Sequence, residues 1–425
     1  MLRRTIIPIA VVALALGGLA ACGGDDDDDD AASDDTEATD DTEAEATTTT
    51  AAPLDGPPIK IMTIGEFSAG VSNPEIPEGI QGAAEGINSR GGINGSPLEV
   101  IVCDTNNDPN TAAECGRQAV DEGVAAVVGG LTLFGGEYFP LLEENKIPAI
   151  GNVLATVADF TSPVSYPVYG GIISTSAALP YALAVSGAAR IATARIDLTE
   201  GVVIPLFGNT ALATVGQEYV ADVPIPPNTA DMATYVAQTQ AAEPDGVVVA
   251  LPAQDSLNFL TEILAANPEI KAALVSTETD AVREALGDEI ADRLVYNDSF
   301  VVDEESEVYQ QYLADMEAAG FDEVGDFRND MYAATVVFAE IAKQLPAGQV
   351  TAAGIWDLLP TQTEVRTGLT PPINFSAPYP VPNSPIPGLR VFNVCVQIAT
   401  LDAEGLAVLQ PGFIDPFTAE DCPAP

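Results

Sequence analysis

Ile59-Lys60-Ile61-Met62-Thr63-Ile64-Gly65 is a short, almost wholly apolar run, and Leu98-Glu99-Val100-Ile101-Val102-Cys103 is another. Between them stand a helix-patterned run from about Pro77 to Arg90 and the turn Gly91-Gly92-Ile93-Asn94-Gly95. The first run alternates too little for a sheet with one wet face, so it predicts a strand in a parallel sheet covered on both sides. The glycines after Arg90 suit a helix end in which a left-handed residue is needed. The order strand, helix, strand predicts a right-handed crossover unit and an α/β fold.

The same unit places a candidate binding site. In parallel α/β sheets, ligands gather in the crevice beyond the carboxyl ends of the strands. Phe67 and Ser68 follow the first strand, so we expect them at that crevice.

The bulk composition excludes several classes of function. The chain has 425 residues, of which 47% are hydrophobic, so it can form two or three domains with a large buried core. A formal net charge of -48 argues against nucleic acid as a partner, because phosphate binding needs clustered Lys and Arg. The sequence contains no histidine, which removes the commonest general base and the commonest metal ligand. We therefore expect no catalytic residues, no metal site and no cofactor.

Residues 1–22 read as a secretion signal, with Arg3 and Arg4 as the positive start and an apolar run too short to span a bilayer comfortably. The end of this segment, Leu19-Ala20-Ala21-Cys22, resembles the bacterial lipoprotein cleavage motif, in which the cysteine becomes the lipid-bearing first residue. The alternative is a plain signal peptide with a chance cysteine. Lipidation of Cys22 would hold the protein on the extracytoplasmic face of the cell membrane.

Residues 23–57 form an acidic, Thr-rich tether. An aspartate run followed by Asp, Glu, Ala and Thr cannot bury enough apolar surface to offset chain entropy, so this segment is predicted to be disordered. It lacks the ordered ligand spacing of an EF-hand, which argues for a spacer rather than a calcium site.

The α/β rhythm continues to Gly151 and restarts near Gly170. The clearest buried strand of the second half is Gly246 to Leu251, and Val215 to Val223 is another strand candidate. The proline-rich stretch from Pro371 to Pro387 predicts irregular structure. A β-hairpin is expected at Arg390 to Thr400 with Leu406 to Leu409, turning at Asp402-Ala403-Glu404-Gly405.

The glycine-rich turn carries a family resemblance. Gly86-Ile87-Asn88-Ser89-Arg90-Gly91-Gly92-Ile93-Asn94-Gly95 resembles the pattern found in leucine/isoleucine/valine-binding proteins, the extracytoplasmic receptors of branched-chain amino acid ABC importers. The stretch Cys103 to Pro109 and the helix after it fit the same family. The resemblance is good from about Ile59 to Gly151 and plausible to about Ala342, and the proline-rich tail fits poorly.

The resemblance implies a type I periplasmic binding protein fold. Two Rossmann-like lobes with parallel sheets would be joined by a multi-strand hinge, with a ligand cleft between them. The first lobe would take residues 58–172 plus 300–389, and the second would take residues 173–299 plus 390–425. The partners implied are a small-molecule ligand and ABC permease subunits, and the protein is expected to be a monomer without nucleic acid.

The candidate ligand-binding residues stand in loops after predicted strands. In the first lobe the N–H groups of residues 131–135 enter a helix and favour a carboxylate. The resemblance implies that hydroxyls and N–H groups of this lobe hold an amino acid's carboxylate, while an acid of the second lobe meets its ammonium. By position that acid is Glu278, with Asp197 second. The full candidate set is Phe67, Ser68, Thr132, Leu133, Phe134, Gly135, Asn152, Thr156, Asp197, Thr199, Gln254 and Glu278.

The chain departs from the amino-acid binders at one place, and plainer readings stay open. A hydroxyl residue usually stands near where this chain has Leu133 and Phe134; either Thr132 replaces it by a one-residue shift, or the ligand is not an α-amino acid. Glu278 could equally cap a helix, Asp197 could be a solvated loop acid, and Phe134 could belong to the core. Tyr332, on a long helix, is expected to pack rather than to touch ligand.

With Cys22 lipidated, four cysteines remain, which allows three pairings. Export makes disulfides plausible. Cys103 and Cys115 flank one loop and a helix start, so they are the natural pair, and Cys395 then pairs with Cys422. The rival, a free thiol nucleophile, has no histidine to activate it.

The leading function is therefore a lipid-anchored receptor that delivers a small solute (an amino acid, amide or short carboxylate) to an ABC importer. The alternatives are a ligand-sensing module for a membrane signalling partner, a binding fold that has lost its ligand and a secreted enzyme. No Gly-x-Ser-x-Gly motif and no metal cluster supports an enzyme.

Overall fold

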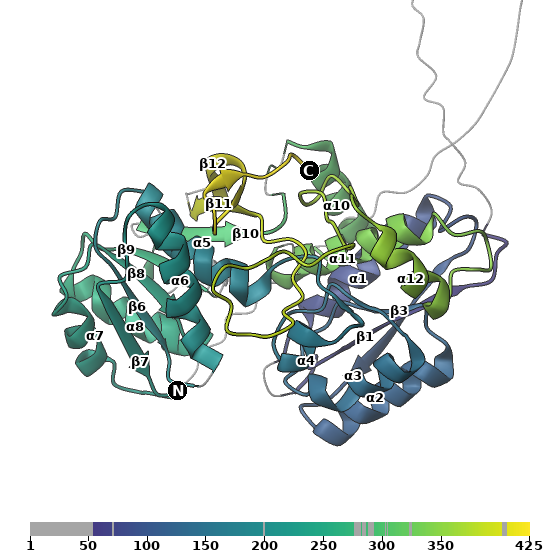
Figure 1. Cartoon of the computed structure of the whole chain (residues 1–425), viewed down its shortest axis with the longest axis horizontal. Coiled ribbons are helices and arrows are strands. Elements are labelled where there is room, and N and C mark those ends of the chain that lie inside the picture. The colour runs from purple at the N-terminus through teal and green to yellow at the C-terminus, as the bar shows by residue number, and fades with distance from the viewer. Residues whose placement is uncertain are drawn as a thin grey trace, which may run out of the picture. The chain divides into compact units, whose positions relative to one another are not determined.

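The computed structural model describes residues 54–69, 72–198, 200–275, 282, 286–287, 293–301, 303, 305–322, 325–401 and 406–425. These residues form two sheets, each with its own helices and its own buried clusters. We call the five-stranded sheet with its helices lobe 1, and the eight-stranded sheet with its helices lobe 2 (Figure 1).

The sheet of lobe 1 is parallel throughout and has the strand order β2-β1-β3-β4-β5. Its strands are β1 (Ile59–Gly65), β2 (Leu98–Asp104), β3 (Ala126–Val128), β4 (Ala149–Ile150) and β5 (Ser165–Tyr166). Six of the seven residues of β1 are buried, including neighbours that point to opposite faces. This burial confirms that helices cover both faces of the sheet at β1.

Helices from both ends of the chain pack on this sheet, because α11 lies against α1 and β3 (Figure 1). The helices of lobe 1 are α1 (Glu75–Ser89), α2 (Pro109–Glu122), α3 (Gly135–Asn145), α4 (Val157–Thr161), α10 (Glu307–Ala318), α11 (Asp326–Ala342) and α12 (Ala352–Leu358). A short 3₁₀ turn, Leu359–Thr361, follows α12. Late helices thus return to the first sheet.

The glycine-rich motif is a structural clamp. α1 ends at Ser89, and Gly91 and Gly92 follow with φ of 98° and 66°, the left-handed conformation that the sequence predicted. The side-chain amide of Asn88 pairs with the N–H and C=O of Leu98 at 2.7 and 2.9 Å, which ties α1 to the start of β2. Asn94 donates to two carbonyls just after α11, those of Lys343 and Leu345. Both asparagine side chains are therefore bonded within lobe 1.

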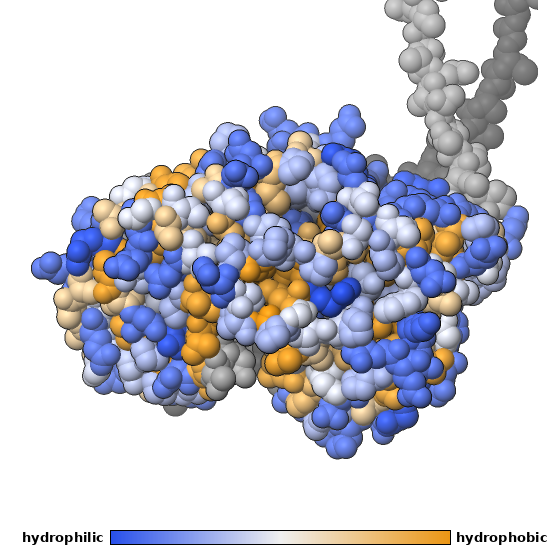
Figure 2. Space-filling view, viewed as in Figure 1, coloured by the Kyte–Doolittle hydropathy of each residue, from blue (hydrophilic) through white to orange (hydrophobic). Residues whose placement is uncertain are grey.

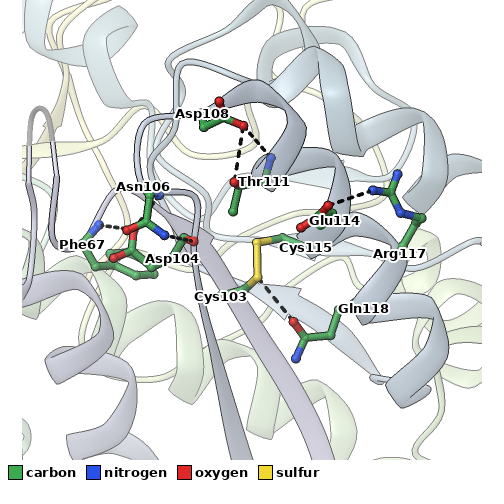
Figure 3. Close-up of a disulfide and its surroundings, with 10 residues drawn as sticks. All are labelled: Phe67, Cys103, Asp104, Asn106, Asp108, Thr111, Glu114, Cys115, Arg117 and Gln118. Carbon is green, nitrogen blue, oxygen red and sulfur yellow. Dashed lines mark hydrogen bonds and ion pairs between the residues drawn. A yellow bond between two sulfur atoms is a disulfide. The ribbon is translucent and has the colours of Figure 1, made fainter.

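α2 begins with an N-cap that the sequence encodes. The Asp108 side chain accepts hydrogen bonds from the N–H groups of Asn110 and Thr111 at 2.9 Å, and Pro109 occupies the first helical turn. The helix ends at Gly123, which has a φ of 63°. The disulfide Cys103–Cys115 joins the end of β2 to α2 (Figure 3).

The sheet of lobe 2 is mixed, with the order β13-β12-β11-β10-β9-β8-β6-β7. Strands β6 to β10 are parallel, and β11 to β13 extend the sheet in antiparallel fashion. The strands are β6 (Ile191–Ile196), β7 (Ala221–Ile225), β8 (Gly246–Ala250), β9 (Lys271–Leu274), β10 (Leu294–Asp298), β11 (Val396–Leu401), β12 (Leu406–Asp415) and β13 (Glu420–Asp421).

The helices of lobe 2 are α5 (Gly171–Val185), α6 (Val203–Thr214), α7 (Ala233–Gln240) and α8 (Ala253–Ala266), with a 3₁₀ turn at Glu200–Val202. α5 has hardly a polar face, because it packs against α6 and the strands β8 to β11. The strand expected at 215–223 is shorter and later: residues up to 220 form the turn after α6, and pairing with β6 begins at Ala221.

The predicted hairpin is present, as β11 paired with β12, although its first strand starts at Val396 rather than Arg390. Its turn, residues 402–405, lies outside the described residues. The second disulfide, Cys395–Cys422, links the start of β11 to the C-terminal segment. Both disulfides are the pairings that the sequence favoured.

The proline-rich segment, residues 371–387, is irregular, as expected, and together with the residues up to Phe392 it contributes to the cores of both lobes. Phe375 and Phe392 pack around Tyr166 of β5 in lobe 1, and Arg390 lies over the ring of Tyr166. Val381 and Val391 belong to the core cluster that contains α5. Residues 371–392, which we call the proline-rich bridge, therefore connect the two hydrophobic cores.

Candidate ligand-binding site at the carboxyl edge of the first sheet

The carboxyl ends of the parallel strands in lobe 1 meet at one edge, where each strand is followed by a polar side chain. Glu66 follows β1, Asp104 ends β2, Thr132 comes shortly after β3, and Asn152 follows β4. The candidate residues Phe67, Ser68 and Thr132 to Gly135 therefore lie on loops of this same edge.

Ser68 and Phe67 are both bound to Asp104. The Ser68 hydroxyl donates to Asp104 Oδ2 and the Phe67 N–H to Asp104 Oδ1 (Figure 3 draws the latter). Burial would raise the pKa of Asp104, but the hydrogen bonds from Ser68, Asn106 and Phe67 outweigh it and hold this pKa below its ordinary value. Asp104 therefore stays ionised and holds the loop after β1 in place.

Thr132 and Leu133 are bound to a residue that the sequence analysis passed over. The Thr132 hydroxyl donates to Glu66 Oε1 at 2.8 Å, and the Leu133 N–H donates to the same oxygen at 3.3 Å. The Phe134 N–H donates to Thr132 Oγ1 at 3.0 Å. Glu66 is only 3% exposed. A protein carboxylate thus receives two of the donors that the sequence analysis assigned to a ligand carboxylate.

Thr156 caps α4 together with Asp159. The N–H and the hydroxyl of Thr156 donate to Asp159 Oδ2 at 2.7 and 2.6 Å, which makes a capping box. Gly135 at the start of α3 leaves room for this pair, since a Cβ there would lie 2.3 Å from Thr156 Oγ1. Burial of Asp159 raises its pKa to about 6, against the opposing effect of the hydrogen bonds from Thr156.

Asn152 and Tyr138 form the next part of the edge. The Asn152 Nδ2 donates to the Tyr138 hydroxyl at 3.1 Å, and Asn152 Oδ1 is buried without a hydrogen-bond partner. Burial first, and then the charges of Asp159 and Glu66, raise the pKa of Tyr138 well above its ordinary value. Tyr138 therefore lies close enough to both acids to feel their charges.

A second pair of acids lies where β10 and α11 approach each other. Burial and then the charge of Asp298 raise the pKa of Asp330 well above its ordinary value. The Tyr169 hydroxyl, close to Asp330, is buried and has no hydrogen-bond partner. Sequence reasoning named none of these three residues.

The described candidate residues of lobe 2, Asp197 and Gln254, are exposed and make fewer hydrogen bonds than those of lobe 1. Asp197 is exposed directly after β6, where its N–H donates to the carbonyl of Ile225. Gln254 is exposed in the first turn of α8 and donates to Asn258. Three candidates lie outside the described residues: Cys22, Thr199 and Glu278.

Large apolar side chains are unusually exposed at the carboxyl edges of both sheets. Val157 is 75% exposed and Leu133 64% exposed in lobe 1, and Val202 and Leu198 are about half exposed in lobe 2. Figure 2 shows apolar surface over α6 and beside α4. Exposed apolar residues gathered near polar groups are typical of ligand-binding surfaces.

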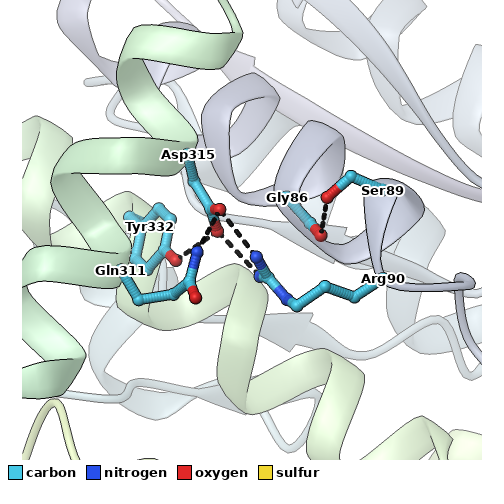
Figure 4. Close-up of polar contacts among 6 residues, drawn as sticks. All are labelled: Gly86, Ser89, Arg90, Gln311, Asp315 and Tyr332. Atoms are coloured by element: carbon cyan, nitrogen blue, oxygen red, sulfur yellow. Dashed lines mark hydrogen bonds and ion pairs between the residues drawn. The ribbon is translucent and has the colours of Figure 1, made fainter. Parts of the chain in front are cut away.

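A cavity of about 260 Å³ lies elsewhere in lobe 1, lined by residues of α1, α10, α11 and the loop that contains Thr367. Its polar groups already satisfy one another: Arg90 makes a bidentate ion pair with Asp315, and Tyr332 also donates to Asp315 (Figure 4). Lys343 is paired with Glu340. Because these groups leave little for a ligand, the strand ends remain the candidate site. Tyr332 is buried and packs against Tyr312, but it also lines this cavity, so its predicted role in packing alone stays a prediction.

The missed residues could have been found in part. Glu66 follows β1 directly, and Asp159 stands three residues after Thr156, which is capping-box spacing. No pattern in the sequence predicts that Tyr138, Tyr169 and Asp330 lie close to buried acids.

A family model described as "Periplasmic binding protein" matches residues 58–393. The chain belongs to this family. The two sheets, rich in parallel strands, form the type I periplasmic binding protein fold. A search of curated proteins finds no match. Because members of this family are binding proteins, family membership confirms the expectation of a non-catalytic protein.

Solved structures of periplasmic binding proteins resemble this one in fold at low sequence identity. A leucine binding protein from Thermotoga maritima is 17% identical with a TM-score of 0.64, and the match covers 84% of this chain and 99% of that one. A solute-binding protein of an ABC transporter from R. palustris, in complex with 4-hydroxybenzoate, is 17% identical with a TM-score of 0.67 over 84% and 97% of the chains. A fatty acid ABC transporter substrate-binding protein from Thermomonospora curvata is 14% identical with a TM-score of 0.67 over 88% and 97%.

Within the described part of this binding protein, no helix has the length and apolar character needed to cross a membrane. The same residues contain no cluster of three or more Cys, Asp or Glu side chains placed to hold a metal ion.

Proposed function

We propose that this periplasmic binding protein is a lipid-anchored receptor that holds a small solute between its two lobes and delivers it to an ABC importer. The main support is the edge of lobe 1, where Thr132, Asn152 and Thr156 gather polar groups beside the exposed Leu133 and Val157. Polar groups that converge beside apolar surface suit a small amphipathic ligand. The relatives from T. maritima, R. palustris and T. curvata bind leucine, 4-hydroxybenzoate and fatty acid, respectively.

In this proposal lobe 1 takes residues 58–172 plus 300–389 and lobe 2 takes residues 173–299 plus 390–425. The pairing of β11 with β10 supports the assignment of the C-terminal hairpin to lobe 2. The ligand lies between the two carboxyl edges, so that it contacts Thr132 and Asn152 from one lobe and Asp197, Thr199, Gln254 and Glu278 from the other.

A ligand screen tests the receptor function. The melting temperature of the purified protein should rise with one class among amino acids, amides, amines and short carboxylates, because a ligand that binds only the folded state stabilises it. Replacement of Glu278 by alanine should weaken any ligand that carries an ammonium by roughly tenfold or more, since a hydrogen bond to a charged group is lost. Unchanged affinity in Glu278→Ala would show that this residue does not meet the ammonium.

The lipid anchor has a separate test. Mass spectrometry of the mature N-terminus should find a diacylated Cys22, and Cys22→Ser should release the protein from the membrane fraction. Retention of the Cys22→Ser protein in that fraction would count against the anchor without affecting the ligand-binding proposal.

A further inference from the structure

The N-terminus of α3 is where the sequence analysis placed a ligand carboxylate, and two of the protein's own carboxylates already stand there. Glu66 accepts the Leu133 N–H and the Thr132 hydroxyl just before this helix. Asp159 Oδ2 lies 3.3 Å from the position that a Cβ on Gly135 would take. A helix N-terminus attracts one or two anions, but a third would meet repulsion from both acids in a buried setting.

The side-chain donors of this edge are also in use. Each of the three candidate hydroxyls donates to a carboxylate of its own lobe, and the Asn152 amide donates to Tyr138. These bonds are Ser68 to Asp104, Thr132 to Glu66, Thr156 to Asp159 and Asn152 to Tyr138. None of the three acids makes an ion pair with a Lys or Arg within the described chain.

Acceptors, by contrast, are left over. Glu66 uses Oε1 for both of its hydrogen bonds, and no described residue donates to its Oε2. Asn152 is 2% exposed, and its Oδ1 has no partner. Both groups flank the loop after β3, because the Glu66 N–H donates to the carbonyl of Leu131 and the Val153 N–H donates to the carbonyl of Gly130. An unpaired buried acceptor such as Asn152 Oδ1 is costly, so a ligand that supplies donors gains more here than one that supplies acceptors.

We propose that Glu66 takes the place of a ligand carboxylate, and that the solute is an amine or amide without a carboxylate, whose N–H group donates to Glu66 Oε2 and Asn152 Oδ1. This inference rests on the proposed receptor function and narrows its ligand class. The exposed Leu133, whose N–H donates to Glu66, favours a solute with an apolar body.

The first experiment uses the wild-type protein and ligands that share a carbon skeleton. Butylamine, butyramide and butyrate form one matched set, and phenethylamine, phenylacetamide and phenylacetate form another. Affinities are measured by calorimetry, and leucine is included as an amino acid. The amine or amide of a set should bind at least tenfold more tightly than its carboxylate, which is the ratio expected from one hydrogen bond to a charged group.

The second experiment compares two isosteric charge removals on lobe 1. Glu66→Gln should weaken an ammonium ligand by roughly 10- to 100-fold and an amide ligand by less, because only the ammonium depends on the negative charge. Glu122→Gln is the control, since Glu122 pairs with Lys60 on the exposed surface near the other end of β1. It removes the same charge and should leave the affinity unchanged.

The outcomes separate this inference from the receptor function itself. If a carboxylate or leucine binds best, or if Glu66→Gln weakens an ammonium ligand no more than Glu122→Gln does, the inference is overturned while the receptor function stands. If no compound of any class binds, both are overturned. Should Glu66→Gln fail to fold, the wild-type ranking of amine, amide and carboxylate still decides the question.

Discussion

Two buried carboxylates of lobe 1 are satisfied in opposite ways. Asp315 on α10 accepts four hydrogen bonds: two from the guanidinium of Arg90 and one each from Gln311 and Tyr332 (Figure 4). Glu66 after β1 accepts one hydroxyl and one backbone N–H, both at Oε1, and makes no ion pair with a described Lys or Arg. Both oxygens of Asp315 therefore accept hydrogen bonds within the protein, whereas Oε2 of Glu66 has no donor among the described residues.

The difference separates acids that hold the fold from acids that can serve a ligand. The pair of Arg90 and Asp315 joins α1 to α10, so its cation and anion both belong to the architecture. The charge of Glu66 is supported only by neutral donors, which leaves room for a positive or N–H-bearing group from outside. Removal of the Asp315 charge should therefore lower the stability of the fold. Removal of the Glu66 charge should lower the affinity for a ligand and change the stability little.

The largest effect is expected for Asp315→Asn. The variant keeps the shape of the side chain but leaves Arg90 without its anion and turns an acceptor into a donor that faces other donors. We expect a loss of about 2–4 kcal/mol in the free energy of unfolding, below the usual cost of breaking a fully buried pair because Arg90 is half exposed. Urea denaturation measures it. The surface variant Glu364→Gln, which breaks the exposed pair with Arg366, is the control and should cost less than about 1 kcal/mol.

The next effect is a pH dependence that belongs to Asp159. Burial raises its pKa from 3.8 to about 6, so the folded protein binds this proton more tightly than the unfolded chain does. The stability that the proton contributes is full below pH 3.8 and is lost as the pH rises through about 6. In Asp159→Asn this loss disappears, while the amide oxygen can still accept from Thr156.

The measurement is a double difference. The unfolding free energies of the wild type and Asp159→Asn are compared at about pH 4 and about pH 8, and the variant should gain roughly 2–3 kcal/mol relative to the wild type over this range. The comparison cancels the pH dependence that the many other acids contribute equally to both proteins. An equal difference at both pH values would show that Asp159 does not titrate in this range.

Gly86→Ala tests how tightly the Asp315 cluster is packed. A Cβ at Gly86 would lie 1.9 Å from Asp315 Oδ2, so the carboxylate must move away from Arg90 and Tyr332. The higher helix propensity of alanine offsets about 1 kcal/mol of that cost. We expect a net loss of about 2 kcal/mol, within the range for overpacked cores, measured by thermal unfolding. A more stable variant would mean that the cluster can shift without cost.

The smallest effect is expected for Glu66→Gln on stability. The glutamine oxygen can accept from Thr132 and Leu133 as the carboxylate does, and a buried charge without an ionic partner is removed. The free energy of unfolding should change by less than about 1 kcal/mol, and a gain is as consistent with the structure as a small loss. A loss as large as that of Asp315→Asn would place Glu66 among the residues that hold the fold.

Most of the fold could be predicted from residues whose conformation depends on their neighbours in the sequence. The apolar run of β1 and the left-handed Gly91 and Gly92 fixed the first unit, because strand burial and helix ends depend on a few neighbouring residues. The strand β7 was placed too early because Val215, Tyr219 and Val220 favour strands, although Gly216, Gln217 and Glu218 between them do not. In the structure those residues form the turn after α6, and the register with β6 is decided by pairing that sequence patterns do not contain.

The candidate residues of lobe 1 lie at the predicted edge of the sheet, but their hydrogen-bond partners were not foreseen, and their role in ligand binding stays a prediction. Thr132, Asn152 and Thr156 do lie at the carboxyl edge, because the rule for parallel sheets depends only on strand order. The partners of their side chains could not be foreseen, since Glu66 and Asp104 meet these loops across neighbouring strands. The position of these residues in the chain therefore predicted that they lie at the carboxyl edge of the sheet. The negative charges that Glu66 and Asp104 bring to this edge depend on tertiary contacts.

The proline-rich bridge has a mechanical consequence. It supplies Phe375 and Phe392 to the aromatic cluster around Tyr166, and it supplies Val381 and Val391 to the core that contains α5. A rotation of one lobe against the other must bend the proline-rich bridge or pull its side chains out of a close-packed interior, where even small gaps are costly. These contacts therefore oppose a rotation that would separate the two cores.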